Sequence, residues 1–144
     1  MAIEYVGQLT FGGIAYPYFE FRVPAGFPSP AQDHLEQQIS LDELFNLRAP
    51  HVFLCRVSGD SMKDVGIFDT DIALVDRSIP VRSGCIVVAS LNNEDLIKRY
   101  CKEGDDQVVL RAENPAYGPR YLMENDQLLV AGVVRYSVRC HDDS

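Results

Sequence analysis

The chain has 144 residues, the length of one ordinary domain, and 47% of them are hydrophobic, so it can bury a core without disulfides. Its 21 acidic residues outnumber the 13 basic ones, and the resulting net charge of −8 would repel a phosphate backbone. No apolar run approaches the roughly 18 residues of a membrane span, and the N-terminal sequence lacks the pattern of a signal peptide. We therefore expect no direct nucleic-acid binding, no membrane contact and a cytoplasmic location.

The cysteines lack the short spacings that zinc sites and redox dithiols use. Cys55, Cys85, Cys101 and Cys140 each lie in apolar or strand-like sequence, which is typical of buried free thiols in a reducing compartment. The aspartates of residues 60–71 likewise lack the spacing of a calcium loop. We predict no metal site and no cofactor.

Residues 1–30 are predicted to form an extended N-terminal arm. Glycines and prolines interrupt both the helical and the strand period there, so no long helix fits. The arm is also rich in tyrosine and phenylalanine, unlike disordered segments, so we expect its rings to cover apolar surface elsewhere. The domain proper is then expected over residues 31–144.

A short helix of about two turns is predicted after Ser40. Ser40 and Glu43 have the spacing of a capping box, in which the hydroxyl and the carboxylate each satisfy a free backbone amide. Leu41, Leu44 and Phe45 would then form one apolar face. Residues 31–47 carry the only helical signals, and the stretch from Ala31 to Ile39 is the more ambiguous part.

From residue 51 onward the sequence is almost entirely of β type. Segments rich in β-branched residues alternate with turn-forming residues such as Asn92-Asn93. The predicted strands span residues 51–57, 71–76, 85–91, 96–101, 108–112 and 128–138. We predict a mainly β protein, a compact, curled antiparallel sheet or barrel with one short helix.

Two of these segments carry the residues for nucleophilic chemistry. The sequence Ser58-Gly59-Asp60-Ser61 ends the first strand, where a glycine allows a sharp turn that presents the following serine. Lys98 alternates with Leu96 and Tyr100 on one strand face, and a buried lysine loses its charge readily enough to accept a proton. A serine beside a neutral lysine is a complete nucleophile and base. On composition alone, an ordinary turn and a solvated strand edge remain open.

The histidines do not favour a different nucleophilic site. His34 lies in the segment before the helix, His51 follows a proline and His141 lies in the acidic tail. None has the neighbours that a Ser/His/Asp triad needs. A serine paired with lysine therefore fits this sequence better than a conventional hydrolase.

The chain resembles the catalytic half of the LexA-type self-cleaving repressors and of their relative UmuD. The resemblance starts from Ser58-Gly59-Asp60-Ser61-Met62, which is followed by Gly66-Ile67 and Asp69-Thr70-Asp71. Further matches are residues 25–31, Ile97-Lys98, Asn114-Pro115-Ala116-Tyr117 and Gly132-Val133-Val134. Together they run from about Val23 to Val138.

The resemblance implies a Ser/Lys dyad that acts on its own chain. Ser61 would be the nucleophile, Lys98 the general base and the peptide bond between Ala25 and Gly26 the substrate. The small side chains of that pair would let the segment lie close to a serine. The backbone amides of Asp60 and Ser61 would stabilise the oxyanion.

Two positions depart from the family pattern. Thr70 stands where the family usually has glycine, which affects the geometry of that turn. Pro24 precedes the scissile pair and removes an amide that an extended substrate could use for strand pairing, so cleavage could be slow or need a trigger.

Within the family, the sequence favours a UmuD-like protein. Only 25 residues precede Gly26, which we expect to be too few for a DNA-binding module. The resemblance then implies a homodimer, a RecA filament on single-stranded DNA as activator in the SOS response, and a UmuC-like Y-family translesion polymerase as partner. The alternatives are a non-enzymatic accessory module with a vestigial dyad and a signal-peptidase-like enzyme acting in trans.

Overall fold

The computed structural model describes residues 2–8, 15–19, 35–47 and 50–142. The chain divides into a large unit, Met1–Gln8 with Pro50–Ser144, and a small unit, Leu9–Ala49. The predicted boundary between arm and domain, near residue 30, lies outside the described residues and stays a prediction. Among the described residues, no helix is both long enough and apolar enough to cross a membrane.

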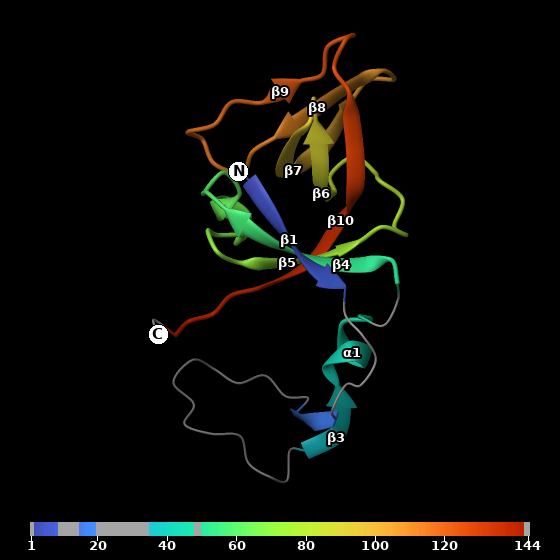
Figure 1. Ribbon diagram of the computed structural model, residues 1–144, viewed down its shortest axis with the longest axis vertical. Coiled ribbons are helices and arrows are strands. Elements are labelled where there is room, and N and C mark those ends of the chain that lie inside the picture. Colours follow the sequence, from blue (N-terminus) through green and yellow to red (C-terminus); the bar gives the residue numbers. More distant parts are fainter. Residues whose placement is uncertain (1, 9–14, 20–34, 48–49, 143–144) are drawn as a thin grey trace. The chain divides into compact units, whose positions relative to one another are not determined.

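The large unit is built on one eight-stranded sheet in the order β1-β4-β5-β10-β6-β7-β8-β9, with every neighbouring pair antiparallel (Figure 1). Its strands are β1 (Ala2–Gln8), β4 (Val52–Ser58), β5 (Ile72–Asp76), β6 (Ile86–Leu91), β7 (Glu94–Glu103), β8 (Gln107–Arg111), β9 (Arg120–Tyr121) and β10 (Leu128–Val138). The mainly β prediction with a curled antiparallel sheet is confirmed.

The long strand β10 joins the two halves of this sheet. Its first half pairs with β6 and its second half with β5, and its register shifts at Val130/Gly132 and again at Val134/Tyr136. Such irregularities bend a strand and increase its twist, which lets one strand serve both halves of a curled sheet. Gly132 sits between the shifts, where a Cβ would lie only 2.8 Å from a methyl group of Val75.

The six predicted strands are confirmed to within two residues at each end. Asn92 and Asn93, with φ of 51° and 67°, form the two-residue turn between β6 and β7. Asparagine tolerates this left-handed backbone, which matches the twist of a tight hairpin. This turn sets the register that places Lys98 opposite Val87.

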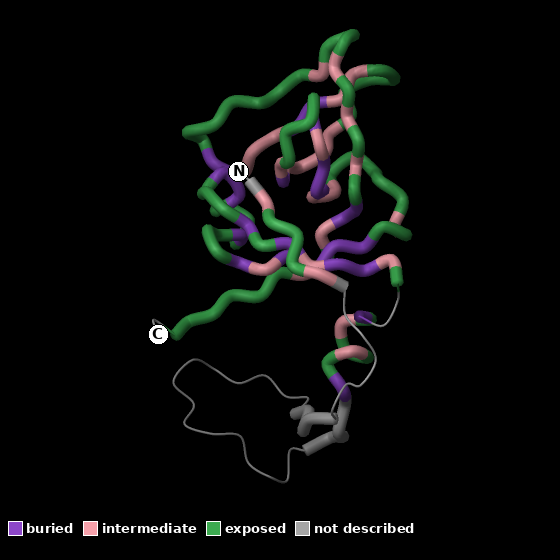
Figure 2. Tube along the Cα trace, viewed as in Figure 1, coloured by how far each residue is buried: buried purple, intermediate pink, exposed green. Residues whose placement is uncertain are grey.

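The core lies inside the curl of the sheet, where Figure 2 shows the buried residues. Alternate residues of β4, namely Phe53, Cys55 and Val57, point into it. They pack with residues that follow β4 and with β5, β6 and β7: Met62, Ile67, Ala73, Val75, Val88 and Ile97. The core therefore holds the residues next to both predicted catalytic positions, Met62 beside Ser61 and Ile97 beside Lys98.

The cysteine prediction needs correction. All four are free, and only Cys55 is buried. Burial, with the nearby Asp95 carboxylate, raises the pKa of the Cys55 thiol to about 11. Cys85 and Cys101 are half-buried and Cys140 is exposed, so a strand-like sequence did not guarantee burial.

Residues 2–8 form a strand that sequence analysis assigned only to an extended arm. β1 pairs with β4 along its length, from Ala2 opposite Ser58 to Gln8 opposite Phe53. Its backbone is extended, as expected, but it belongs to the large sheet. The strand escaped detection because its partner lies far along the chain.

In the small unit, β2 (Ala15–Phe19) pairs antiparallel with β3 (Leu35–Ser40), and α1 (Leu41–Leu44) follows directly. The predicted cap is confirmed, since the Ser40 hydroxyl accepts a hydrogen bond of 3.1 Å from the Glu43 amide. The helix is shorter than the two turns predicted, because Asn46 turns left-handed with a φ of 55°. Two residues of the predicted apolar face, Leu41 and Leu44, are exposed.

Candidate active site

Ser61 lies in a tight turn at the end of β4. Gly59 has a φ of 92°, which favours glycine, and its amide donates a 2.8 Å hydrogen bond to the Asp69 carboxylate. A short 3-10 helix, Lys63–Val65, follows the serine and ends at Gly66, whose φ is 82°. Two glycines and one aspartate thus form the turn that sequence analysis predicted to present Ser61.

The Ser61 hydroxyl is buried and unpaired. The residue is 0% exposed, and within the described part of the chain its Oγ has no hydrogen-bond partner. A buried polar atom without a partner costs about 1–3 kcal/mol, so folds retain one chiefly where function needs it. The serine is therefore no ordinary turn residue.

The segment 113–117 holds this turn from the far side. The Glu113 amide donates to the Ser61 carbonyl at 2.8 Å, and the Asp64 amide donates to the Glu113 carbonyl at 2.9 Å. The buried Asn114 side chain donates to the Asp60 carbonyl at 3.0 Å and accepts from the Ala116 amide. Sequence analysis noted this segment only as a family-like turn and missed its supporting role.

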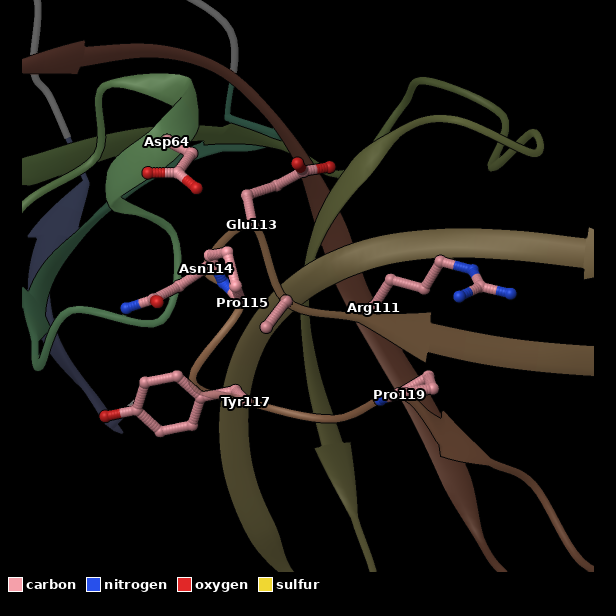
Figure 3. Close-up of a pocket in the computed structure, with 8 residues that line it drawn as sticks. Asp64, Arg111, Glu113, Asn114, Pro115, Tyr117 and Pro119 are labelled. Atoms are coloured by element: carbon pink, nitrogen blue, oxygen red, sulfur yellow. The ribbon is translucent and has the colours of Figure 1, made fainter.

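Tyr117 links the serine turn to the lysine strand. Its hydroxyl donates a 2.6 Å hydrogen bond to the Asp60 carboxylate, and its ring centroid lies 5.5 Å from Lys98 Nζ. Figure 3 shows the tyrosine hydroxyl extended away from the strand that carries Arg111. Ser61 and Lys98 are therefore both brought to segment 113–117, the serine through its backbone and the lysine through this ring.

Lys98 and its neighbour Arg99 on β7 have different surroundings. The Arg99 guanidinium pairs with the Glu113 carboxylate and donates to the Gly84 carbonyl. Lys98 is half-buried, and its burial lowers the pKa of its amine below the ordinary value with no carboxylate of the described residues opposing the shift. A lysine with a lowered pKa is the kind that can accept a proton.

A cavity of about 260 Å³ adjoins the site. It is lined by Asp64, Arg111, Ala112, Glu113, Asn114, Pro115, Tyr117 and Pro119 (Figure 3). It shares Asn114 and Tyr117 with the network around Asp60, but its walls include neither Ser61 nor Lys98. The cavity is thus a neighbour of the predicted dyad and not its opening.

Comparison with known proteins gives the family. Residues 17–135 match the family described as Peptidase S24-like, a stretch that includes the serine turn, the lysine strand and segment 113–117. The chain belongs to the Peptidase S24-like family. This membership places the buried serine and the lysine strand on a scaffold of peptidases.

Curated proteins similar to this chain include LexA repressors. The chain is 40% identical to that of Shewanella amazonensis over 123 residues, which covers 84% of this chain and 58% of the repressor. It is 40% identical to that of Photobacterium profundum, with 84% and 62% covered, and 42% identical to that of Providencia rettgeri, with 81% and 58% covered. The chain thus spans about three fifths of the length of these relatives.

The remaining predicted site residues divide into two groups. Ala25 and Gly26 lie outside the described residues, so the substrate bond stays a prediction. Within the described residues no hydrogen bond uses the amide of Asp60 or of Ser61 as donor, and their role as oxyanion donors stays a prediction. Thr70, at the family's usual glycine position, keeps the left-handed turn with a φ of 71°.

Proposed function

We propose that this chain is a self-cleaving serine peptidase that cuts between Ala25 and Gly26, with Ser61 as nucleophile and Lys98 as general base. The observation that carries the proposal is the buried, unpaired Ser61 hydroxyl in a Peptidase S24-like chain, beside the segment that also faces Lys98. The lowered pKa of Lys98 supports its role, because an amine must be neutral to accept the hydroxyl proton.

The chemistry follows from these groups. Neutral Lys98 takes the proton from Ser61 while Oγ attacks the carbonyl carbon of Ala25, and the protonated lysine then gives its proton to the departing amine of Gly26. Water releases the acyl group as the Ala25 carboxylate and restores the serine. The free amides of Asp60 and Ser61 would stabilise the negatively charged oxygen during both steps.

The burial of Ser61 supports a reaction that takes place within one protein. A hydroxyl that is 0% exposed is poorly placed for free peptides. A tethered segment replaces binding by a high effective molarity, and the small Ala25-Gly26 pair can approach closely. The same burial explains why an activator would be needed to open the site.

The test is the intact mass of the purified protein, incubated at about pH 7 and about pH 10 with and without an activated RecA filament. We expect a product that begins at Gly26, and no product from Ser61→Ala or Lys98→Ala. Lys102→Ala, which removes an exposed lysine from the same strand, is the matched control and should cleave normally. An unchanged mass under all conditions would contradict the proposal and favour the non-enzymatic accessory module.

We further propose a UmuD-like role for the cut chain. The chain would act in the cytoplasm as a homodimer, be cleaved in the SOS response with the RecA filament on single-stranded DNA, and then join a UmuC-like Y-family translesion polymerase. The resemblance to UmuD and a net charge of −8, which disfavours direct DNA binding, support this role. The cut form should bind the polymerase more tightly than the uncut Ser61→Ala form, and equal affinity would count against it.

The relatives' name favours a second candidate, the repression of transcription. A repressor binds operator DNA directly, and this activity belongs to the relatives named above. A gel-shift assay with operator DNA at low salt separates the two roles, because the UmuD-like role predicts no shifted band.

A further inference from the structure

We infer that the edge of β4 is a strand-binding site, and that residues 2–8 of this chain are its exchangeable occupant. In the sheet order, β4 has only β1 and β5 as neighbours. Without β1, the β4 edge would present unpaired backbone groups that recruit another extended strand. β1 fills that edge by the same backbone pairing that protein domains use to capture peptides.

The side chains of β1 show what the site selects. Ile3 packs against the main core cluster, and the Tyr5 ring lies 5.7 Å from the Phe53 ring. Between them Glu4 stands opposite Arg56, a cross-strand pair of opposite charge. The site therefore fits an extended strand with an apolar residue packed on the core, an aromatic residue that contacts Phe53 and stays 57% exposed, and an acidic residue between them.

A second cavity lies beneath this strand. Its volume is about 270 Å³, and β1 contributes Ile3 and Tyr5 to its walls. The other walls come from β4, β6, β7 and β10 and from a loop arginine, and include Phe53, Cys55, Val88, Leu129 and Arg77. Space remains beside the two β1 side chains, so β1 lies over the pocket and does not complete a close-packed core.

The tether explains why β1 stays in place in the intact chain. A strand joined covalently to its site has an effective concentration in the millimolar range, whereas a free strand must compete at its real concentration. For the cut chain, the inference rests on the proposed cleavage between Ala25 and Gly26. The break would turn residues 2–8 from a fixed strand into a ligand that leaves on dilution.

The site itself can be tested without any cleavage. The probe is a fluorescein-labelled peptide with the sequence of residues 1–10, and anisotropy measures its binding to two full-length proteins that also carry Ser61→Ala. One has an intact β1, and the other carries Ile3→Asp and Tyr5→Asp to weaken it. We expect the peptide to bind the second protein at least about tenfold more tightly, since its edge is open.

The matched control is a peptide with aspartate at its third and fifth positions, which should bind neither protein. Failure of the first peptide to bind the protein with the weakened β1, or equal binding of both peptides, would overturn the inference. Cooperative urea unfolding checks that the protein with Ile3→Asp and Tyr5→Asp is folded. If it is not, a protein with Tyr5→Ala takes its place, and the same binding results support or overturn the inference.

A second experiment uses the cut chain. After self-cleavage, size-exclusion chromatography should recover the N-terminal fragment with the large fragment at high concentration and lose it on dilution. Fragments that stay together at every concentration, or separate at every concentration, would overturn the exchangeable occupancy. An absence of cleavage affects only the proposed function, because the peptide assay does not depend on it.

Discussion

At the scale of the residue, the burial of Lys98 decides when the proposed base can work. Burial lowers the pKa of its amine from an ordinary 10.5, so the neutral fraction grows as pH rises through the lowered value. Over about pH 7 to about pH 10 we expect self-cleavage to accelerate as pH rises, with the midpoint of the rise below the ordinary 10.5. Time courses of intact mass across this range measure it.

Lys98→Arg is the variant that tests the role of Lys98 as base most directly. Arginine keeps the positive charge and much of the length but does not lose its proton in proteins. The variant should therefore show no cleavage at any pH. Cleavage by this variant, or a rate that falls as pH rises, would rule out Lys98 as the base.

Asn114 is the residue that holds the backbone ahead of the serine. Asn114→Ala leaves the Asp60 carbonyl and the Ala116 amide without their partner, and we expect it to lower the free energy of unfolding by about 2 kcal/mol. Urea denaturation measures this change. Tyr117→Phe is the control, because it removes one exposed hydrogen bond and should cost far less.

At the scale of the element, β10 depends on a residue without a side chain. Gly132→Ala would place a methyl group 2.8 Å from Val75 and 2.9 Å from the backbone oxygen of Asp76, which cannot move aside cheaply. We expect a loss of about 2 kcal/mol or more in the free energy of unfolding. Gly118→Ala has open space around the new methyl group and should stay within about 0.5 kcal/mol of the wild type. Equal stability of the two variants would mean that β10 does not pass as closely over β5 as described.

The strands of the large sheet were predictable from sequence because their signals are local. Alternating β-branched residues and asparagine turns mark β4 to β8 and β10 to within two residues. β1 was assigned only to an arm, since an edge strand is defined by its partner, and α1 was overestimated because the leucines after its cap find no core. Propensity reports what a segment can form, and long-range contacts decide what it packs against.

The candidate site likewise combines local features that the sequence reveals with long-range contacts that it does not reveal. The serine turn is visible in the sequence because glycine and aspartate mark it locally. The pairing of the neighbouring Arg99 with Glu113 was not, because Glu113 comes from a different strand end. The supporting roles of Asn114 and Tyr117 likewise arise from contacts with Asp60 across the fold.

At the scale of the whole molecule, the C-terminal segment is tied back to the loop that follows the serine turn. Arg139 donates hydrogen bonds of 3.0 Å to both oxygens of the Asp71 carboxylate and one of 2.7 Å to the Gly66 carbonyl. Its guanidinium also lies 4.0 Å from the centre of the Phe68 ring. Asp71 is almost fully buried, so this contact joins the end of the chain to the core beside the proposed nucleophile.

Arg139→Ala should therefore destabilise the whole unit in a pH-dependent way. It leaves the buried Asp71 carboxylate without its cation, and we expect a measurable loss in the free energy of unfolding at neutral pH. Arg135→Ala, which removes an arginine of β10 that lies over the Tyr136 ring and attracts the Asp76 carboxylate without a hydrogen bond between these two described residues, should cost far less.

The sign of the pH dependence follows from Asp71. Burial raises the pKa of its carboxyl, but hydrogen bonds from Arg139 and from the Phe68 amide outweigh this effect and leave the pKa below 3.8. A carboxyl with a lowered folded-state pKa stabilises the fold above its unfolded pKa and loses that contribution as pH falls through the folded value. Without Arg139 the pKa of this carboxyl rises, because two of the effects that lower it are lost. The stability gap between wild type and Arg139→Ala should thus be full at pH 7 and shrink below about pH 4, as measured by urea unfolding at both values. A gap that is independent of pH would show that Arg139 acts through packing on Phe68 and not through the buried charge.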